Sequence, residues 1–202
     1  METGGLVAGR DCGECTMCCV VLGIDDSEIQ KTASTLCRHC TGSGKGGCSV
    51  YANRPRSCRT FFCAWRQLGM LDDDWRPDRS GIFAFLEPFK PDPAEVLDPG
   101  QPPPQAAITL MLTNRPEVTV REQAFVMLVS LHAANGLPVY LSLPAPPGYM
   151  PHRVLLYSKA LTNVAKQNPD HVRAVLEQAL AFMASQPFRP QVFQNRGNDV
   201  SR

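Results

Sequence analysis

Nine cysteines occupy the first third of the chain, and none follows Cys63. Short spacings dominate, in the runs C-G-E-C-T-M-C-C and C-R-H-C. Two residues between cysteines let one backbone turn bring both thiolates to a soft metal, which is typical of zinc and related thiolate sites. The sequence therefore predicts a metal-binding protein. The predicted ligands are Cys12, Cys15, Cys18, Cys19, Cys37, Cys40, Cys48, Cys58 and Cys63.

Disulfides are not expected among these cysteines. Their number is odd, and residues 1–10 lack the apolar stretch of a secretory signal peptide. No segment approaches the roughly 18 apolar residues that a membrane-spanning helix needs. We therefore expect a soluble, cytoplasmic protein with no membrane partner. In that reducing compartment, clustered cysteines serve metal or redox chemistry.

The remainder of the chain predicts an α+β fold. Its 44% hydrophobic content is enough for a core that needs no covalent staples. We expect an irregular cysteine-rich metal-binding module over residues 1–80, an α+β half packed on it over 81–190, and a disordered tail over 191–202. Strands are expected at 82–86, 108–112, 139–143 and 154–157. The proline-rich segment 88–105 suits neither a helix nor a central strand.

Two helices are predicted in the α+β half. Thr119 and Glu122 resemble a capping box before a helix that ends at Asn135 and Gly136. Asn168 is expected to cap the last helix, which ends before Pro187. The order strand, strand, helix occurs twice and suggests a pseudo-repeat without residue-level similarity. The buried stripe of the last helix is predicted to be Val172, Val175, Leu176, Ala179, Leu180 and Met183.

The nine thiols, with His39 as a tenth candidate ligand, exceed the four ligands of one structural zinc site and suffice for two. Cys12, Cys15 and Cys18 can face one centre. The side chain of the adjacent Cys19 points elsewhere, so it serves a second centre, bridges two metals or binds from the opposite side. Spacing alone does not say which cysteines share a metal.

Iron is the alternative to zinc, because thiolates bind both. C-x2-C-x2-C also begins the bacterial ferredoxin run, whose fourth cysteine comes after three more residues and precedes a proline. Here the fourth is Cys19, immediately adjacent and followed by Val20. We therefore favour zinc, with iron or a [4Fe-4S] cluster completed by a distant cysteine as the alternative cofactor.

Basic residues accompany the cysteines. Between Ile29 and Leu71 there are seven lysines and arginines and no acidic residue, while the net charge of the whole chain is +1. A four-thiolate zinc site carries about two negative charges, so nearby cations stabilise it. Arg56 and Arg59 are expected to do so, and nucleic acid is not favoured as the partner of this segment. The aromatic side chains expected to cover the metal are Phe61, Phe62 and Trp65.

The cysteine pattern resembles that of the YkgJ-type cysteine-cluster proteins, described as zinc- or iron-chelating domains. C-G-E-C-T-M-C-C matches their CxxCxxCC signature, and C-R-H-C with residues 48–63 fits their later block. The resemblance covers roughly residues 10–85 and departs at Cys40, where the simpler pattern has an apolar residue. It implies metal chelation by these cysteines. The shared positions in the later block are Cys48, Tyr51, Arg54, Pro55, Cys58, Arg59 and Cys63.

The function predicted from the sequence is metal binding, with the metal in a structural role and no catalytic residue assigned. The first alternative is an iron–sulfur protein that transfers electrons or senses oxidants. The second is an accessory to a protein-modifying enzyme, because a related cysteine cluster occurs in a flagellin lysine methylase. No motif indicates what the α+β half binds.

Overall fold

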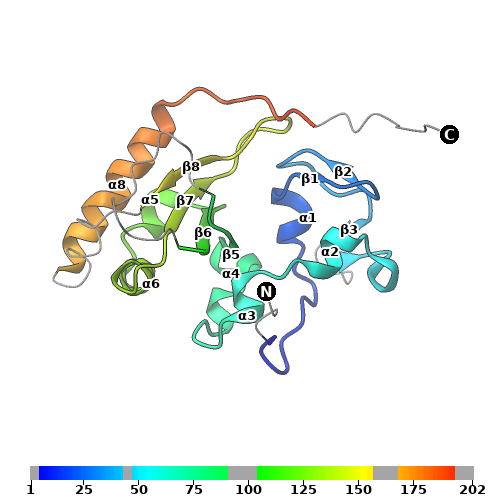
Figure 1. Ribbon diagram of the computed structural model, residues 1–202, viewed down its shortest axis with the longest axis horizontal. Coiled ribbons are helices and arrows are strands. Elements are labelled where there is room, and N and C mark those ends of the chain that lie inside the picture. Colours follow the sequence, from blue (N-terminus) through cyan, green and yellow to red (C-terminus); the bar gives the residue numbers. More distant parts are fainter. Residues whose placement is uncertain (1–4, 43–46, 91–103, 157–167, 194–202) are drawn as a thin grey trace.

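The computed structural model describes residues 5–42, 47–90, 104–156 and 168–193. A four-stranded sheet lies at the centre, with helices on one side and the cysteine-rich module on the other (Figure 1). The architecture is α+β, which confirms the predicted fold class. No described helix is both long enough and apolar enough to cross a membrane.

The sheet consists of β5 (Ile82–Pro88), β6 (Ala106–Leu112), β7 (Val139–Leu143) and β8 (His152–Leu155), in that spatial order. The pairs β5–β6 and β7–β8 are antiparallel, whereas β6 and β7 are parallel. A parallel pair needs a long crossover, and α5 and α6 lie within it. The predicted strands are present, although the second and the fourth each begin two residues earlier than expected. Residues 91–103 of the proline-rich segment, and Tyr157, lie outside the described residues.

Alternation along the strands gives the sheet two apolar faces. On one face, Ile108, Leu110 and Leu112 of β6 pack in the main core with α6 and α8. On the other face, Met111 packs with Phe83 of β5 against the cysteine module. Because both faces are covered, six consecutive residues of β6, Ala107–Leu112, are buried.

The crossover contains the short α5 (Pro116–Thr119) and the longer α6 (Gln123–Ala134). The predicted capping box is wrong. Pro116 begins a separate turn of helix that ends at Thr119, and Glu122 precedes α6 without a side-chain cap bond. The predicted stop at Asn135 and Gly136 is confirmed, since Gly136 adopts a φ of 72° that favours glycine.

The last helix, α8 (Pro169–Ser185), begins where the sequence predicts. The Asn168 side chain accepts a hydrogen bond from the Asp170 amide at 2.9 Å, and the helix ends before Pro187. Its predicted stripe faces the main core: four members are buried and two are partly buried. The buried members are Val172, Leu176, Ala179 and Met183, and the partly buried ones are Val175 and Leu180.

The cysteine module contains only short elements. Val21 of α1 packs on Phe83 and Met111 of the sheet, while Ala64 and Trp65 of α3 join the main core. The elements are α1 (Met17–Val21), β1 (Ile24–Asp25), β2 (Gln30–Lys31), β3 (Cys40–Gly42), β4 (Gly47–Cys48), η1 (Tyr51–Asn53), α2 (Arg56–Thr60), α3 (Ala64–Gln67), η2 (Asp73–Trp75) and α4 (Pro77–Ser80).

The segment after α8 crosses from the sheet half to the module (Figure 1). Phe188 stacks on His152 of β8 with ring centroids 4.5 Å apart. Gln191 then accepts a hydrogen bond from the Ala33 amide at 2.8 Å. Part of the predicted disordered tail therefore makes defined contacts, and its residues 194–202 lie outside the described residues.

Candidate metal centre

The cysteines come from separate short segments of the module. The C-x2-C pairs Cys12–Cys15 and Cys37–Cys40 are each closed by a backbone hydrogen bond of 2.9 Å, from the second amide to the first carbonyl. Another, from the Cys37 amide to the Cys19 carbonyl at 2.9 Å, joins the second pair to α1. Cys12 and Cys15 precede α1, Cys18 and Cys19 belong to it, Cys37 precedes β3, Cys40 begins β3, Cys48 ends β4, Cys58 lies in α2 and Cys63 precedes α3.

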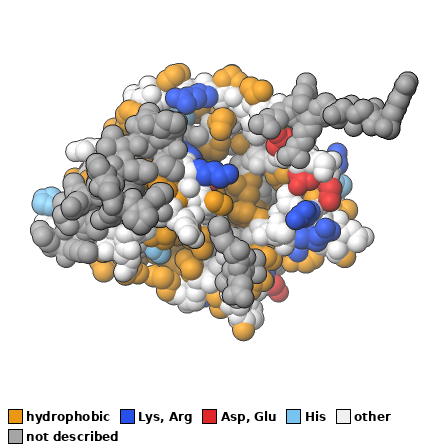
Figure 2. Space-filling view, viewed as in Figure 1, with side chains coloured by type: hydrophobic (Ala, Val, Ile, Leu, Met, Phe, Trp, Pro, Cys, Tyr) orange, Lys and Arg blue, Asp and Glu red, His pale blue; other side chains and the backbone are white. Residues whose placement is uncertain are grey.

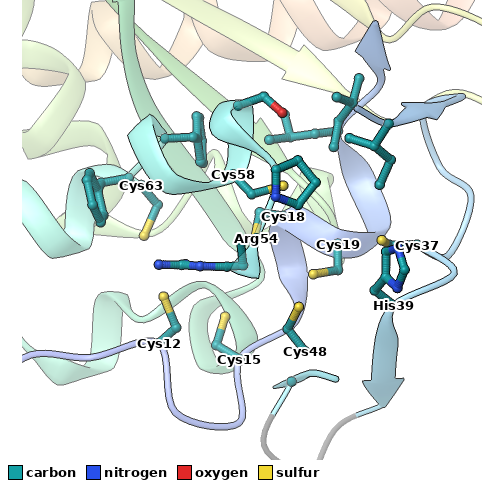
Figure 3. Close-up of a pocket in the computed structure, with 18 of the residues that line it drawn as sticks. Cys12, Cys15, Cys18, Cys19, Cys37, His39, Cys48, Arg54, Cys58 and Cys63 are labelled. Carbon is teal, nitrogen blue, oxygen red and sulfur yellow. The ribbon is translucent and has the colours of Figure 1, made fainter. Parts of the chain in front are cut away.

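Eight of the nine cysteines line one cavity of about 340 Å³, together with His39. Cys40 is not among the lining residues. Figure 2 shows a hollowed face with largely hydrophobic side chains, and Figure 3 shows the thiols along the cavity wall. All nine thiols are free. The fold therefore gathers cysteines from up to 51 positions apart, Cys12 and Cys63, around a common space.

Within the described ranges, no three His, Cys, Asp or Glu side chains stand close enough together to hold one metal ion. The thiols face a shared cavity without meeting at a point. The donors are nevertheless the soft ligands that zinc and iron prefer. Sγ moves with the single χ1 angle of a cysteine, so rotamer changes can bring neighbouring thiols together without moving the backbone.

Burial disfavours the thiolate form of several of these cysteines. It raises the pKa of Cys15 to about 11, and it also raises the pKa values of Cys58 and Cys63. A thiol must lose its proton to bind a metal, so binding here releases protons. In the metal-free protein, these thiols are therefore more stable in the neutral form than as thiolates.

Cys18 and Cys19 interact directly although they are adjacent in sequence. Their side-chain hydrogen bond lowers the pKa of Cys19 and raises that of Cys18, which is also buried. Cys40 makes a second side-chain hydrogen bond with Cys19, which lowers the pKa of Cys19 further. The negative charge of a thiolate is therefore most stable at Cys19, which also lies near the cations Lys31 and Arg54.

Lys31 of β2 is a buried cation beside the thiols, with 7% of its surface exposed. Its ammonium group donates to the carbonyls of Val20 at 3.0 Å and Thr32 at 3.2 Å, and to that of Thr35. Burial lowers the pKa of Lys31, and the charges of Cys37 and Cys19 oppose that shift. Lys31 thus ties α1 to the following turn and places a positive charge near the cysteines.

Arg54 and Arg66 are the arginines that line the cavity. Each has a buried Nε atom without a hydrogen-bond partner among the described residues. Nη1 of Arg66 lies 3.6 Å from Sγ of Cys12, whereas Arg54 stacks on Tyr51 at 3.9 Å. Buried arginine donors usually have partners, so these two indicate that the cavity is built to hold negative charge.

The arginines that line the cavity are not those expected to compensate the metal. Arg56 and Arg59 of α2 are exposed and do not line the cavity. Nη1 of Arg59 instead donates to the Arg54 carbonyl at 2.8 Å. Arg54, Arg66 and Lys31 occupy the positions near the thiols, and no local sequence signal distinguished them among the seven basic residues of this segment.

The remaining candidates lie as follows. Phe61, Phe62 and Trp65 line the cavity, as expected of a hydrophobic cover. Phe61 packs on Phe83 with ring centroids 5.9 Å apart, so the sheet forms part of the cavity wall. His39 lines the cavity and its Nε2 accepts a hydrogen bond from Arg38 at 3.1 Å.

No known protein family, curated protein or solved structure matches this chain. The resemblance to the YkgJ-type proteins therefore rests on the cysteine spacing and stays a prediction.

Proposed function

We propose that this protein binds a soft metal through the thiolates of its cysteine module, with zinc as the metal and a structural role for it. The observation that carries this proposal is the convergence of eight free cysteines on one cavity. In a cytoplasmic location, which we also propose, such thiols stay reduced and available to a metal.

The surroundings of the thiols support the same function. A site with four thiolates and one divalent ion carries about two negative charges, which need compensation in an apolar setting. Lys31, Arg54 and Arg66 supply positive charge beside the cysteines. The wall of the cavity is largely hydrophobic, which strengthens the attraction between these cations and the thiolates.

The alternative is an iron–sulfur cluster with a redox role. A cavity of about 340 Å³ is large enough for a cluster of several atoms. Four thiolates hold such a cluster as they hold zinc. Neither function assigns a catalytic residue to this chain.

Elemental analysis and an absorbance spectrum of protein purified without oxygen test the proposal. Bound zinc without a visible band supports it. Iron with acid-labile sulfide and a broad band near roughly 400 nm, as thiolate-ligated clusters give, replaces it with the redox function. Protein that carries no metal and takes up neither zinc nor iron would overturn both.

A double variant, Cys12→Ser with Cys15→Ser, tests the ligands. We expect loss of metal and of structure in the N-terminal module, since structural metal binding contributes folding free energy. Ser27→Ala, at an exposed position of the same module, is the control and should retain the metal. An unchanged metal content and melting curve in the double variant would contradict the proposal.

A further inference from the structure

We propose that the thiols form two separate metal centres: a first centre of Cys12, Cys15, Cys18 and Cys63, and a second centre of Cys19, Cys37, Cys48 and Cys58. This inference rests on the proposed function and gives it a ligand assignment. It leaves Cys40, which does not line the cavity, outside both centres.

The first centre lies at one end of the cavity. No three of its thiols are close enough together to hold one ion in the residues that the structure describes, so they must change rotamer to do so. In Figure 3, Cys12, Cys15 and Cys63 lie at the end of the cavity toward which the Arg54 guanidinium points. Cys63 interacts electrostatically with Cys12 and Cys15, and Cys18 does so with the same two residues. The four side chains come from the loop before α1, from α1 itself and from the residue before α3.

The second centre lies at the other end of the cavity, where Figure 3 places Cys19, Cys37 and Cys48 near His39. Cys58 of α2 interacts electrostatically with these three thiols. The hydrogen bond from the Cys37 amide to the Cys19 carbonyl holds the two backbones together. Cys40 adjoins this set through its hydrogen bond with Cys19, yet its side chain lies outside the cavity.

The helix α1 contributes neighbouring cysteines to different centres. Successive side chains of an α-helix differ in direction by about 100°, yet the side chains of Cys18 and Cys19 are hydrogen-bonded to each other. Cys18 also interacts with Cys12 and Cys15 of the first centre, and Cys19 interacts with Cys58 of the second. The two centres therefore meet at α1, which contributes one ligand to each.

Each centre has a cation beside it. Arg66 lies against the first centre, with Nη1 3.6 Å from Sγ of Cys12. Lys31 interacts most with the thiols of Cys37 and Cys19 in the second centre and less with Cys18 of the first. Arg54 interacts with Cys19 and points toward the first centre in Figure 3, so it is placed between the two. The positions of these three cations suit two sets of thiolates better than a single set.

Anaerobic titration of the metal-free protein with Co²⁺ tests this assignment, because cobalt bound by four thiolates in a tetrahedron absorbs visible light. We expect the unaltered chain to bind about two ions per molecule, since each centre fills the four ligands of a tetrahedral site. Cys63→Ser and Cys58→Ser should each bind about one tightly. The spectra of these two variants should add up to that of the unaltered protein.

Cys40→Ser is the matched control and should still bind two ions. Where Cys58→Ser fails to fold, Cys48→Ser tests the same centre, because Cys48 lies in the separate β4. One ion per unaltered chain, or loss of both ions from a folded single variant, would overturn the two-centre assignment and leave metal binding intact. A lower count in Cys40→Ser would also overturn it. No uptake of Co²⁺, zinc or iron by the unaltered protein would overturn the proposed function itself.

Discussion

In the sheet half, β6 buries six consecutive residues, whereas the module strands β1–β4 are two or three residues long and the helix α1 buries only Val21. The sheet half is organised by apolar packing on a regular scaffold, which needs no added ligand. The N-terminal part of the module contacts the sheet through a small apolar cluster of Val21, Phe83 and Met111 and has a cavity lined by thiols, whereas Ala64, Trp65 and Leu71 join the main core. The two halves thus depend on different interactions, and perturbations should separate them.

Metal removal should have the largest effect, because it should destabilise the module much more than the sheet half. Structural zinc sites in small domains contribute about 10–16 kcal/mol of apparent binding free energy, and that free energy should stabilise the module alone. Hydrogen exchange measured with and without a chelator checks this. The Cys37 and Cys40 amides should lose protection, while the amides of β6 keep theirs. Equal loss in both halves would show that they unfold as one unit.

Leu141→Ala should weaken the sheet half instead. Leu141 of β7 has 0% exposure, and truncation of such a side chain costs about 2–5 kcal/mol of unfolding free energy. Urea denaturation followed by hydrogen exchange would localise the loss to the sheet, with the metal content unchanged. Leu36→Ala, at 57% exposure, is the control, and its effect should stay within about 0.5 kcal/mol. Metal loss from Leu141→Ala would contradict the division.

Lys31→Met should destabilise the module. The variant leaves the carbonyls of Val20, Thr32 and Thr35 without their charged donor, at a cost on the order of 2–3 kcal/mol. It also removes positive charge beside Cys37, so metal release to a chelator should be faster. Melting curves and release rates check both effects. Lys90→Met, at an exposed lysine, should change neither.

Gln191→Ala should loosen the connection between the halves. The amide of the buried Ala33 loses its acceptor, which costs about 1–3 kcal/mol when no water replaces it. Faster hydrogen exchange at Ala33, with β6 unchanged, is the expected result. Gln105→Ala, at an exposed position, serves as the control. Unaltered exchange at Ala33 would mean that the side chain of Gln191 contributes nothing to the module.

The smallest expected effect is the pH dependence of the stability of the sheet half. Burial lowers the pKa of His132 below its ordinary value of 6.5, and its Nε2 has no hydrogen-bond partner within the described part of the chain. The unfolded state therefore binds the proton more readily, and stability falls as the pH drops through 6.5 toward the folded pKa. His132→Gln should reduce this loss in denaturation curves at pH 7 and pH 5. An identical pH dependence in both proteins would contradict the assignment.

Local chemistry made parts of this fold predictable. Asn168 caps α8, and Gly136 follows the end of α6, because each signal acts within a few residues. The capping box predicted at Thr119 is absent because a competing local signal, Pro116, begins a separate helix there. The set of thiols was predictable from spacing. Their distribution in the cavity and the roles of Arg54 and Arg66 depend on the path of the chain, which spacing does not encode.

The hydrogen bond between Ala33 and Gln191 spans 158 positions of sequence. At a synthesis rate of about 5–20 residues per second, Gln191 is added roughly 8–30 seconds after Ala33. All nine cysteines have been synthesised by then, but the module cannot form its hydrogen bond with Gln191 until that residue has been added. During that interval the Ala33 amide lacks the acceptor that it has in the complete fold, so the module reaches its final set of contacts only at the end of synthesis.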